Sequence, residues 1–347
     1  MSRELKYFQA LNEATDLCMA NDPSVLVMGL GVPDPKGVFG TTLGLVDKYG
    51  DERVTDLPTS ENGMTGVALG AALAGMRPIM THIRFDFALL AIEQLVNQAA
   101  KWHFMFGGRM RVPLVVRMIV GRGWGQGPQH SQALHAWFAH VPGLKVVLPT
   151  TPYDAKGLLV SSIEDDNPVM FIEHRWLYNI SGPVPEPIYR VPIGTARVMR
   201  AGTDVSIIAI SYMALEALRA ADALNAAGIS AEVIDLRSLR PWDEQTVLES
   251  VRRTGRVVVT DIASKTGGFG AEVLARISEE GIPLLAPPVR VCLPDSPTPT
   301  SPALAAHYYP RADGIASATA GMFGMAVAAI PQRGPLDVPD PTFTGPF

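Results

Sequence analysis

The sequence predicts an α/β protein of two domains, each a largely parallel sheet flanked by helices. Short apolar runs alternate with helical patterns along most of the 347 residues. Strands that are apolar throughout are typical of parallel sheets covered on both faces. A proline-rich stretch, "SGPVPEPIYRVPIG" at 181–194, interrupts the alternation and indicates a linker. We therefore expect one domain over 1–180, a second over 195–330, and an extended tail over 331–347 that lies over a partner.

Five strands separated by helices are expected in the first domain. Each strand is a short run rich in β-branched or other apolar residues. The expected strands are 25–29, 78–82, 112–120, 145–149 and 168–173, and the clearest helices are 87–104 and 151–165.

The second domain repeats this alternation. Its first helix is followed by Gly228, and glycine is common just after a helix C-terminus. The expected strands are 204–211, 230–235, 255–261 and 289–293, with helices over 213–228 and 270–277.

Composition excludes several classes of protein. The formal net charge is −5 and the basic residues form no cluster, so neither nucleic acid nor a membrane surface is an expected partner. The most apolar stretch, "GMTGVALGAALAGM", is too short and too rich in glycine to span a bilayer. Cys18 and Cys292 lie far apart without metal-ligand spacing. With no targeting signal at the N-terminus, they favour a reducing compartment, the cytoplasm.

The glycine-rich stretches do not match the usual phosphate loops. "GLGVPDPKG" has Asp34 where a dinucleotide fingerprint needs its third glycine, and "GRGWGQGPQHSQ" at 121–132 fits neither that pattern nor a P-loop. "TGGFGAEV" at 266–273 is either an anion site at a helix start or a tight turn. A nicotinamide or nucleotide enzyme is therefore not favoured.

Three residues attract attention without being diagnostic singly. Glu61 stands where a strand-like run gives way to a helix, and a carboxylate there is often only a helix-start charge worth about 0.3–1 kcal/mol. His130, in "GPQHSQ", can be a locally bonded loop histidine. Phe85, in "IRFDF", can be a core aromatic.

Together with their surroundings they resemble one family over most of the chain. The stretches are "SENGMTGVALGAALAGMRPI", "FDFALLAIEQLVNQAAK", "GPQHSQALHAWFAHVPGLKVVLPTTPYDAKGLL", "DNPVMFIEH", "VIDLRSLRPWD" and "TGGFGAEVLARI". They are similar to the β subunit of thiamine-diphosphate-dependent 2-oxoacid dehydrogenases, such as pyruvate, branched-chain and acetoin dehydrogenases. The resemblance implies a transketolase-like pyrimidine-binding domain followed by a transketolase C-terminal-like domain.

The resemblance also implies roles for these residues. Glu61 would hydrogen-bond a pyrimidine ring nitrogen of thiamine diphosphate, so that the exocyclic nitrogen removes the thiazolium proton. Phe85 would lie against the pyrimidine ring. His130 would move protons near the incoming 2-oxo carbonyl, and Gln129 would shape its loop and contact the cofactor. The 2-oxo acid would be decarboxylated and its acyl group passed to lipoamide or another acceptor.

Metals are implied in the same way. Relatives often hold potassium through backbone carbonyls, which here would be those of Leu114, Ser162, Ile163, Asp165 and Asn167. The magnesium motif of thiamine enzymes, "GDG" followed by "N" some thirty residues later, is missing, and "YGDERV" has only its start. We therefore expect an α subunit to hold magnesium in an α2β2 heterotetramer, with a lipoyl acyltransferase core as a further partner.

Alternatives remain open at this point. The chain can be half of a split transketolase-like enzyme that transfers a ketol unit, or a degenerate subunit, against which Glu61 and His130 argue. A flavodoxin-like carrier would not need two domains.

Thr260 and Asp261 replace an acidic pair of many relatives, and His82 and Arg84 are unusual beside the expected site. Arg84 is expected to be a solvated surface residue. Which 2-oxo acid is the substrate depends on a few pocket side chains, several of them expected from the α subunit, so this sequence does not identify it.

Overall fold

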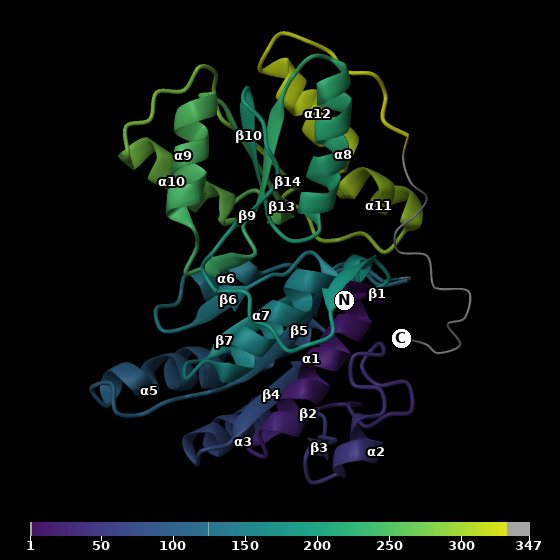
Figure 1. Ribbon diagram of the computed structural model, residues 1–347, viewed down its shortest axis with the longest axis vertical. Coiled ribbons are helices and arrows are strands. Elements are labelled where there is room, and N and C mark those ends of the chain that lie inside the picture. The colour runs from purple at the N-terminus through teal and green to yellow at the C-terminus, as the bar shows by residue number, and fades with distance from the viewer. Residues whose placement is uncertain (1, 124, 332–347) are drawn as a thin grey trace. The chain divides into compact units, whose positions relative to one another are not determined.

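The computed structural model describes residues 2–123 and 125–331, and it confirms the α/β class with largely parallel sheets (Figure 1). The chain forms two compact units. The first combines the chain up to residue 119 with residues 134–196 and 236–243. The second combines residues 120–133 and 197–235 with the chain from residue 244 onward. Each unit thus includes a short segment that comes from the sequence range of the other.

A seven-stranded sheet forms the core of the first unit, in the order β12-β6-β7-β5-β4-β2-β3. The pairs β2–β3, β2–β4, β4–β5 and β6–β7 are parallel, and the edge strand β12 is antiparallel to β6. These strands are β2 (Val25–Gly29), β3 (Val54–Thr55), β4 (Arg77–His82), β5 (Val115–Val120), β6 (Lys145–Val147), β7 (Val169–His174) and β12 (Ser238–Arg240).

Helices cover this sheet on both faces. The chain moves in opposite directions along the sheet from β3 to β5 and from β6 to β7, so right-handed crossovers put α3 and α7 on opposite faces. Figure 1 shows α1 packed beside α7. The helices are α1 (Tyr7–Asn21), α2 (Leu45–Tyr49), α3 (Glu61–Leu73), α4 (Phe85–Ala88), η1 (Leu89–Ala91), η2 (Glu93–Ala99), α5 (Ala100–Met105), α6 (His135–Ala139), α7 (Pro152–Glu164) and η3 (Arg175–Leu177).

All five strands expected in this unit form within a few residues of their expected ends. The single helix expected over 87–104 is instead a succession of α, 3₁₀ and π turns, from α4 to α5. Periodicity does not separate these forms, because the repeats of the 3₁₀ and π turns each differ from that of the α-helix by less than one residue per turn. The stretch expected to be a linker, 181–194, begins with β8 (Ser181–Pro185), which pairs antiparallel with β1 (Ser2–Lys6).

Residues 236–243 join the first unit through buried polar contacts. Arg237 Nη1 donates to Asp154 Oδ1 at 2.8 Å, and the Leu148 amide donates to the Arg237 carbonyl at 2.8 Å. Asp154 lies in the first turn of α7, which Thr151 caps by accepting a hydrogen bond from the Asp154 amide at 3.1 Å. A contact of this range has no sequence signal, since its partners are 83 residues apart.

The second unit has a five-stranded sheet in the order β14-β13-β10-β11-β9. Figure 1 shows α9 and α10 on one side of it and α8 and α12 on the other. Gly228 follows α8 with a φ of 82°, the left-handed conformation expected of a glycine there. Its elements are β9 (Arg197–Arg200), β10 (Val205–Ala209), α8 (Met213–Ala226), β11 (Ala231–Asp235), α9 (Glu244–Thr254), β13 (Val257–Ser264), α10 (Gly270–Glu279), β14 (Val289–Leu293), α11 (Pro302–Tyr308) and α12 (Ala312–Gly321).

Parallel strands dominate this sheet too. β10 pairs in parallel with β11 and β13, and β13 pairs in parallel with β14, whereas β9 is antiparallel to β11. The four strands expected here all form. None of the helices in the described ranges combines the length and the apolar character that crossing a lipid bilayer requires. The tail expected over 331–347 lies, beyond its first residue, outside the described ranges.

A buried ion pair lies in the core of the first unit, between β5 and β7. The guanidinium of Arg117 meets the carboxylate of Glu173 in a bidentate pair at 2.5 and 2.9 Å, and both side chains are fully buried. Tyr178 donates its hydroxyl hydrogen to Glu173 at 2.5 Å, and burial raises the pKa of Tyr178 well above its usual value. Each charge is therefore matched inside the core.

Removing one partner of this pair should destabilise the chain strongly. For Glu173→Gln we expect a loss of about 3–5 kcal/mol in the free energy of unfolding, because the Arg117 charge stays buried without a counter-charge. Urea unfolding followed by circular dichroism measures it. Glu164→Gln, which breaks the exposed pair with Arg190, is the control and should change stability far less. Equal losses in the two variants would contradict the prediction.

Candidate active site

Glu61 is the first residue of α3, the next helix along the chain after the short strand β3. It lies in the first turn, where the helix dipole favours a carboxylate. Its side chain is half-buried, and among the described residues it has no hydrogen-bond or ion-pair partner. Among the described residues, the helix dipole is therefore the interaction that stabilises its charge. Such a carboxylate is available to a ligand.

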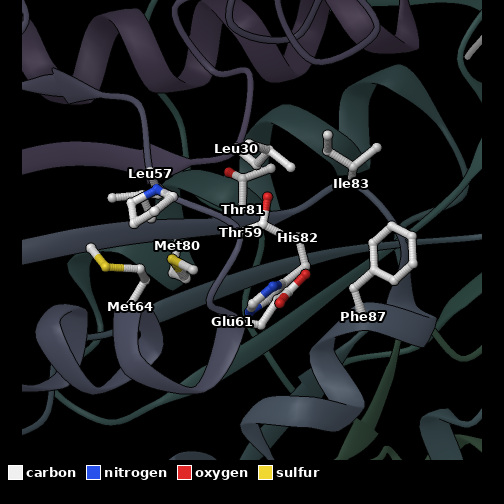
Figure 2. A pocket seen from close by; sticks show the side chains of 11 residues that line it. Leu30, Leu57, Thr59, Glu61, Met64, Met80, Thr81, His82, Ile83 and Phe87 are labelled. Atoms are coloured by element: carbon white, nitrogen blue, oxygen red, sulfur yellow. The ribbon is translucent and has the colours of Figure 1, made fainter.

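Glu61 lines a pocket at the carboxyl ends of β2, β3 and β4, within the first unit (Figure 2). Ligands of parallel α/β sheets bind at this edge. Its volume of about 30 Å³ is room for a few atoms, so the pocket is one wall of a site and not a closed cavity. The lining is apolar except at four positions: Leu30, Leu57, Pro58, Met64, Met80, Ile83 and Phe87 are joined by Thr59, Glu61, Thr81 and His82.

Two polar residues at the end of β4 add to this wall. Thr81 is 1% exposed, and its hydroxyl has no hydrogen-bond partner among the described residues. A buried polar group without a partner costs free energy, so a ligand that bonds to it gains from that site. The Nε2 atom of His82 lies 3.2 Å from the hydroxyl of Thr65, one turn after Glu61 on α3. Burial lowers the pKa of His82 from 6.5 to about 4, so its imidazole is neutral near pH 7.

Phe85, which the resemblance places against the pyrimidine, and Phe87 take different positions in α4. Phe85 is fully buried and packs against Phe138, with ring centroids 5.4 Å apart. Phe87 lines the pocket, where Figure 2 shows its ring on the side of Glu61 away from Met64. Both belong to α4, so a short helical turn decides which aromatic ring faces outward. The motif "FDF" places two phenylalanines two residues apart, and this spacing is compatible with either ring lining the pocket.

Gln129 and His130 belong to the second unit, in the loop between β5 and α6. Gln129 is exposed, His130 is half-buried and Ser131 is buried. The amide of His130 donates to the carbonyl of Gly127 at 3.2 Å, so these two residues close a tight turn. The expected site residues thus divide between units: Glu61 and Phe85 lie on the first, and Gln129 and His130 on the second.

The five residues expected to bind potassium lie around the end of α7 and the start of β7. The carbonyls of Ile163 and Asp165 accept hydrogen bonds from Arg77 Nη1 at 3.0 and 3.1 Å. The carbonyl of Leu114 accepts one from the Val169 amide at 2.9 Å. A carbonyl oxygen has two lone pairs, so these atoms keep one for a cation. Ser162 is buried and Asn167 is half-buried in the same region.

The expectation that Arg84 is solvated is wrong. Arg84 is 3% exposed, and its guanidinium lies 5.7 Å from the centroid of the Phe39 ring. Arg175 lies over the same ring at 4.4 Å. Burial and the nearby charge of Arg84 lower the pKa of His174 to about 3. The loop that carries Phe39 covers Arg84, and a long-range covering of this kind leaves no local pattern.

Apart from Val67, the outer face of α3 is made of small residues, and it continues to Ala74 just after the helix. Gly63, Val67, Gly70 and Ala74 follow at helical spacing and are all exposed, whereas Thr65, Ala68, Leu69 and Ala72 are buried. A Cβ atom at Gly70 would have no neighbour within 4 Å among the described residues. Such a face lets another backbone approach closely. The sequence shows the glycines, but only the structure shows that no described element of the chain covers them.

The residues of the pocket fit a flat heterocycle that carries a basic nitrogen. The walls are apolar and include one aromatic ring. The half-buried carboxylate of Glu61 and the buried hydroxyl of Thr81 have no hydrogen-bond partner among the described residues. They do not fit a bound divalent metal. Within residues 2–123 and 125–331 there is no group of three or more His, Cys, Asp or Glu side chains arranged to hold one.

Comparisons with known proteins give the same picture. Residues 3–181 match the family model of the transketolase pyrimidine-binding domain, and residues 194–315 match that of the transketolase C-terminal domain. The chain is 45% identical to the acetoin:2,6-dichlorophenolindophenol oxidoreductase subunit beta of Cupriavidus necator, covering 92% of this chain and 97% of that protein. It is 44% identical to the mitochondrial pyruvate dehydrogenase E1 component subunit beta-2 of Oryza sativa subsp. japonica, covering 91% and 86%.

A solved structure is also similar. It is described as a split gene transketolase, an inactive beta4 tetramer, and it matches with a TM-score of 0.76 at 25% identity. The match covers 93% of this chain and 99% of that chain.

The buried neutral His82 should make stability fall with acid. An unfolded chain takes up a proton near pH 6.5, whereas folded His82 does so only near pH 4. The contribution is therefore present above pH 6.5 and is lost as the pH falls toward 4, by about 3 kcal/mol. His82→Gln should lose less stability than the parent chain between pH 7 and pH 4.5 in urea unfolding. If the parent chain and His82→Gln lose the same free energy of unfolding between pH 7 and pH 4.5, the prediction is wrong.

Proposed function

Since the chain belongs to the transketolase-like β subunits of the 2-oxoacid dehydrogenases, we propose that its pocket binds the pyrimidine end of thiamine diphosphate. The observation that carries the proposal is the Glu61 carboxylate, which has no partner among the described residues and lies in an apolar wall. The reaction would be decarboxylation of a 2-oxo acid and transfer of its acyl group to lipoamide or another acceptor.

Glu61 holds a proton at a ring nitrogen of the aminopyrimidine and so sets the state of its exocyclic amine. Thiamine diphosphate supplies the electron sink that decarboxylation needs. The aromatic ring that meets the pyrimidine is that of Phe87, because Phe85 is enclosed by the core. The hydroxyl of Thr81 offers the ring a second hydrogen bond.

His130 moves protons at the substrate carbonyl, with Gln129 beside it. Both residues lie on the loop of the second unit, so the conformation of that loop sets the position of the His130 imidazole. A histidine suits this role because its ordinary pKa is close to neutral pH.

An α subunit completes the site in an α2β2 heterotetramer. Its backbone would approach the small-residue face of α3, where Gly63, Gly70 and Ala74 leave room. The α subunit would hold magnesium and the diphosphate, for which the described residues provide no carboxylate cluster. Potassium would share the carbonyls of Ile163 and Asp165 with Arg77. A lipoyl acyltransferase core is a further proposed partner. The two free cysteines, both at least half-buried, favour the cytoplasm.

A split transketolase is the second candidate, favoured by the similar solved structure. The assembled complex can be assayed with 2-oxo acids and an artificial electron acceptor, and separately with ketose phosphates and an aldehyde acceptor. We expect turnover of 2-oxo acids. Turnover of sugars only would establish the alternative.

Removing the charge of Glu61 should abolish most of the turnover. In the assembled complex, Glu61→Gln is expected to lower kcat by about 10²–10⁴-fold, because the pyrimidine nitrogen loses its acid–base partner. Glu4→Gln, at an exposed carboxylate of the same unit, should leave kcat unchanged. Unaltered turnover in Glu61→Gln would indicate a subunit that only supports its partner.

Binding by the isolated chain gives a second test. Calorimetric titration of the purified chain with thiamine diphosphate and magnesium should show no tight binding, since the metal site is expected on the α subunit. Stoichiometric tight binding would contradict the division of the site between two chains.

A bulky side chain on the outer face of α3 should block assembly without unfolding the chain. Gly70→Met replaces a poor helix former at an exposed position where a Cβ atom has no neighbour within 4 Å, so its fold should be retained. Its side chain would separate α3 from the α subunit. Native mass spectrometry of the two subunits should show α2β2 with the parent chain and with Gly314→Met, a control at an equally open glycine of α12, but not with Gly70→Met.

A further inference from the structure

The loop that carries Gln129 and His130 is anchored within the second unit by residues 298–308. Arg122, at the start of the loop, is 1% exposed and donates from Nη2 to the carbonyl of Thr300. Gly127, in the middle of the loop, is buried against the same threonine. A Cβ atom at Gly127 would lie 2.1 Å from Thr300 Oγ1 and 3.3 Å from Thr300 Cβ. The Thr300 hydroxyl thus occupies the space that any side chain at Gly127 would need.

Gly127 and His130 move together because they are the two ends of one turn. The His130 amide donates to the Gly127 carbonyl at 3.2 Å. Gly127 does not have a positive φ, so another residue can adopt its backbone conformation and only space excludes a side chain. A displacement of Gly127 from Thr300 would therefore be passed to His130 through three peptide units.

Thr300 is exposed, but the segment around it is held in place. Thr298 is 4% exposed and its hydroxyl donates to the Tyr308 hydroxyl at 3.3 Å, while Tyr308 donates to the Ser296 carbonyl at 3.0 Å. Directly after Thr300, α11 begins at Pro302, a residue suited to the first turn of a helix. The segment is fixed on both sides of Thr300, so it can act as a stop for the loop.

We infer that Thr300 and Arg122 are positioning residues, which set where the His130 loop lies. Neither is assigned a contact with substrate. The inference rests on the proposed role of His130, and it adds that the second unit determines the placement of that histidine through a contact near residue 300. Positioning of this kind affects catalysis strongly, because small displacements of a reacting group cost rate.

The first test measures the loop itself, in the full chain and without any assay of activity. Hydrogen exchange followed by mass spectrometry should show faster exchange, by about tenfold, in peptides covering 121–133 for Gly127→Ala. Adding Thr300→Ala removes the hydroxyl and should restore the parent rate, whereas adding Thr300→Ser keeps the hydroxyl and should not. Gly314→Ala, at an open helical glycine of the same unit, is the control and should leave these peptides unchanged.

The second test uses the assembled complex with its α subunit. Gly127→Ala should lower kcat by about 10²-fold with an unchanged affinity for thiamine diphosphate, and Gly127→Ala with Thr300→Ala should recover kcat. If Gly127→Ala does not fold, Arg122→Gln removes the other anchor and should raise exchange over 121–133. Unchanged exchange in Gly127→Ala and Arg122→Gln, or no recovery in the double variant, overturns the inference. Absence of 2-oxo acid turnover in the parent complex would instead overturn the proposed function, and the exchange result would still decide the anchoring.

Discussion

The structure depends most on one placement, that of a carboxylate without a counter-charge at the open end of a parallel sheet. Glu61 occupies the first turn of α3, and the carboxyl ends of β2, β3 and β4 form the wall around it. A half-buried charge in an apolar wall is costly unless a ligand or a dipole balances it. Here the helix dipole supplies part of the balance, and the proposed cofactor nitrogen supplies the rest. The same helix that positions Glu61 leaves its small-residue face exposed.

This arrangement explains why one helix carries so many glycines. A Cβ atom at Gly66 would lie 3.4 Å from the side chain of Gln94 in η2, an ordinary contact, so packing of α3 on its own unit does not require that glycine. Gly63 and Gly70 face outward and leave room for a second backbone. Each glycine costs about 1 kcal/mol of helix stability. If the α subunit approaches this outer face as proposed, close contact there is a physical reason to accept that cost.

The residues proposed to carry the chemistry belong to two units whose sequence ranges interleave. The loop with His130 belongs to the second unit, although it lies between strand β5 and helix α6 of the first. Conversely, residues 236–243 return to the first unit, where Arg237 pairs with Asp154. Both excursions are held by polar contacts between residues far apart in the chain. Such contacts fix where a loop lies more firmly than its own composition could, because glycine-rich segments have little intrinsic preference.

The sequence by itself determined the α/β class, the nine expected strands, the helix start at Glu61 and the family, because these depend on local patterns of apolar residues and on motifs. It did not determine which aromatic ring of "FDF" faces the pocket, nor that Arg84 is buried beneath Phe39. It also did not show that Thr300 limits Gly127 or that Arg77 bonds two of the carbonyls expected to hold potassium. Only the tertiary structure decided these, since each depends on a contact between residues that the chain brings together by folding, and periodicity carries no record of such contacts.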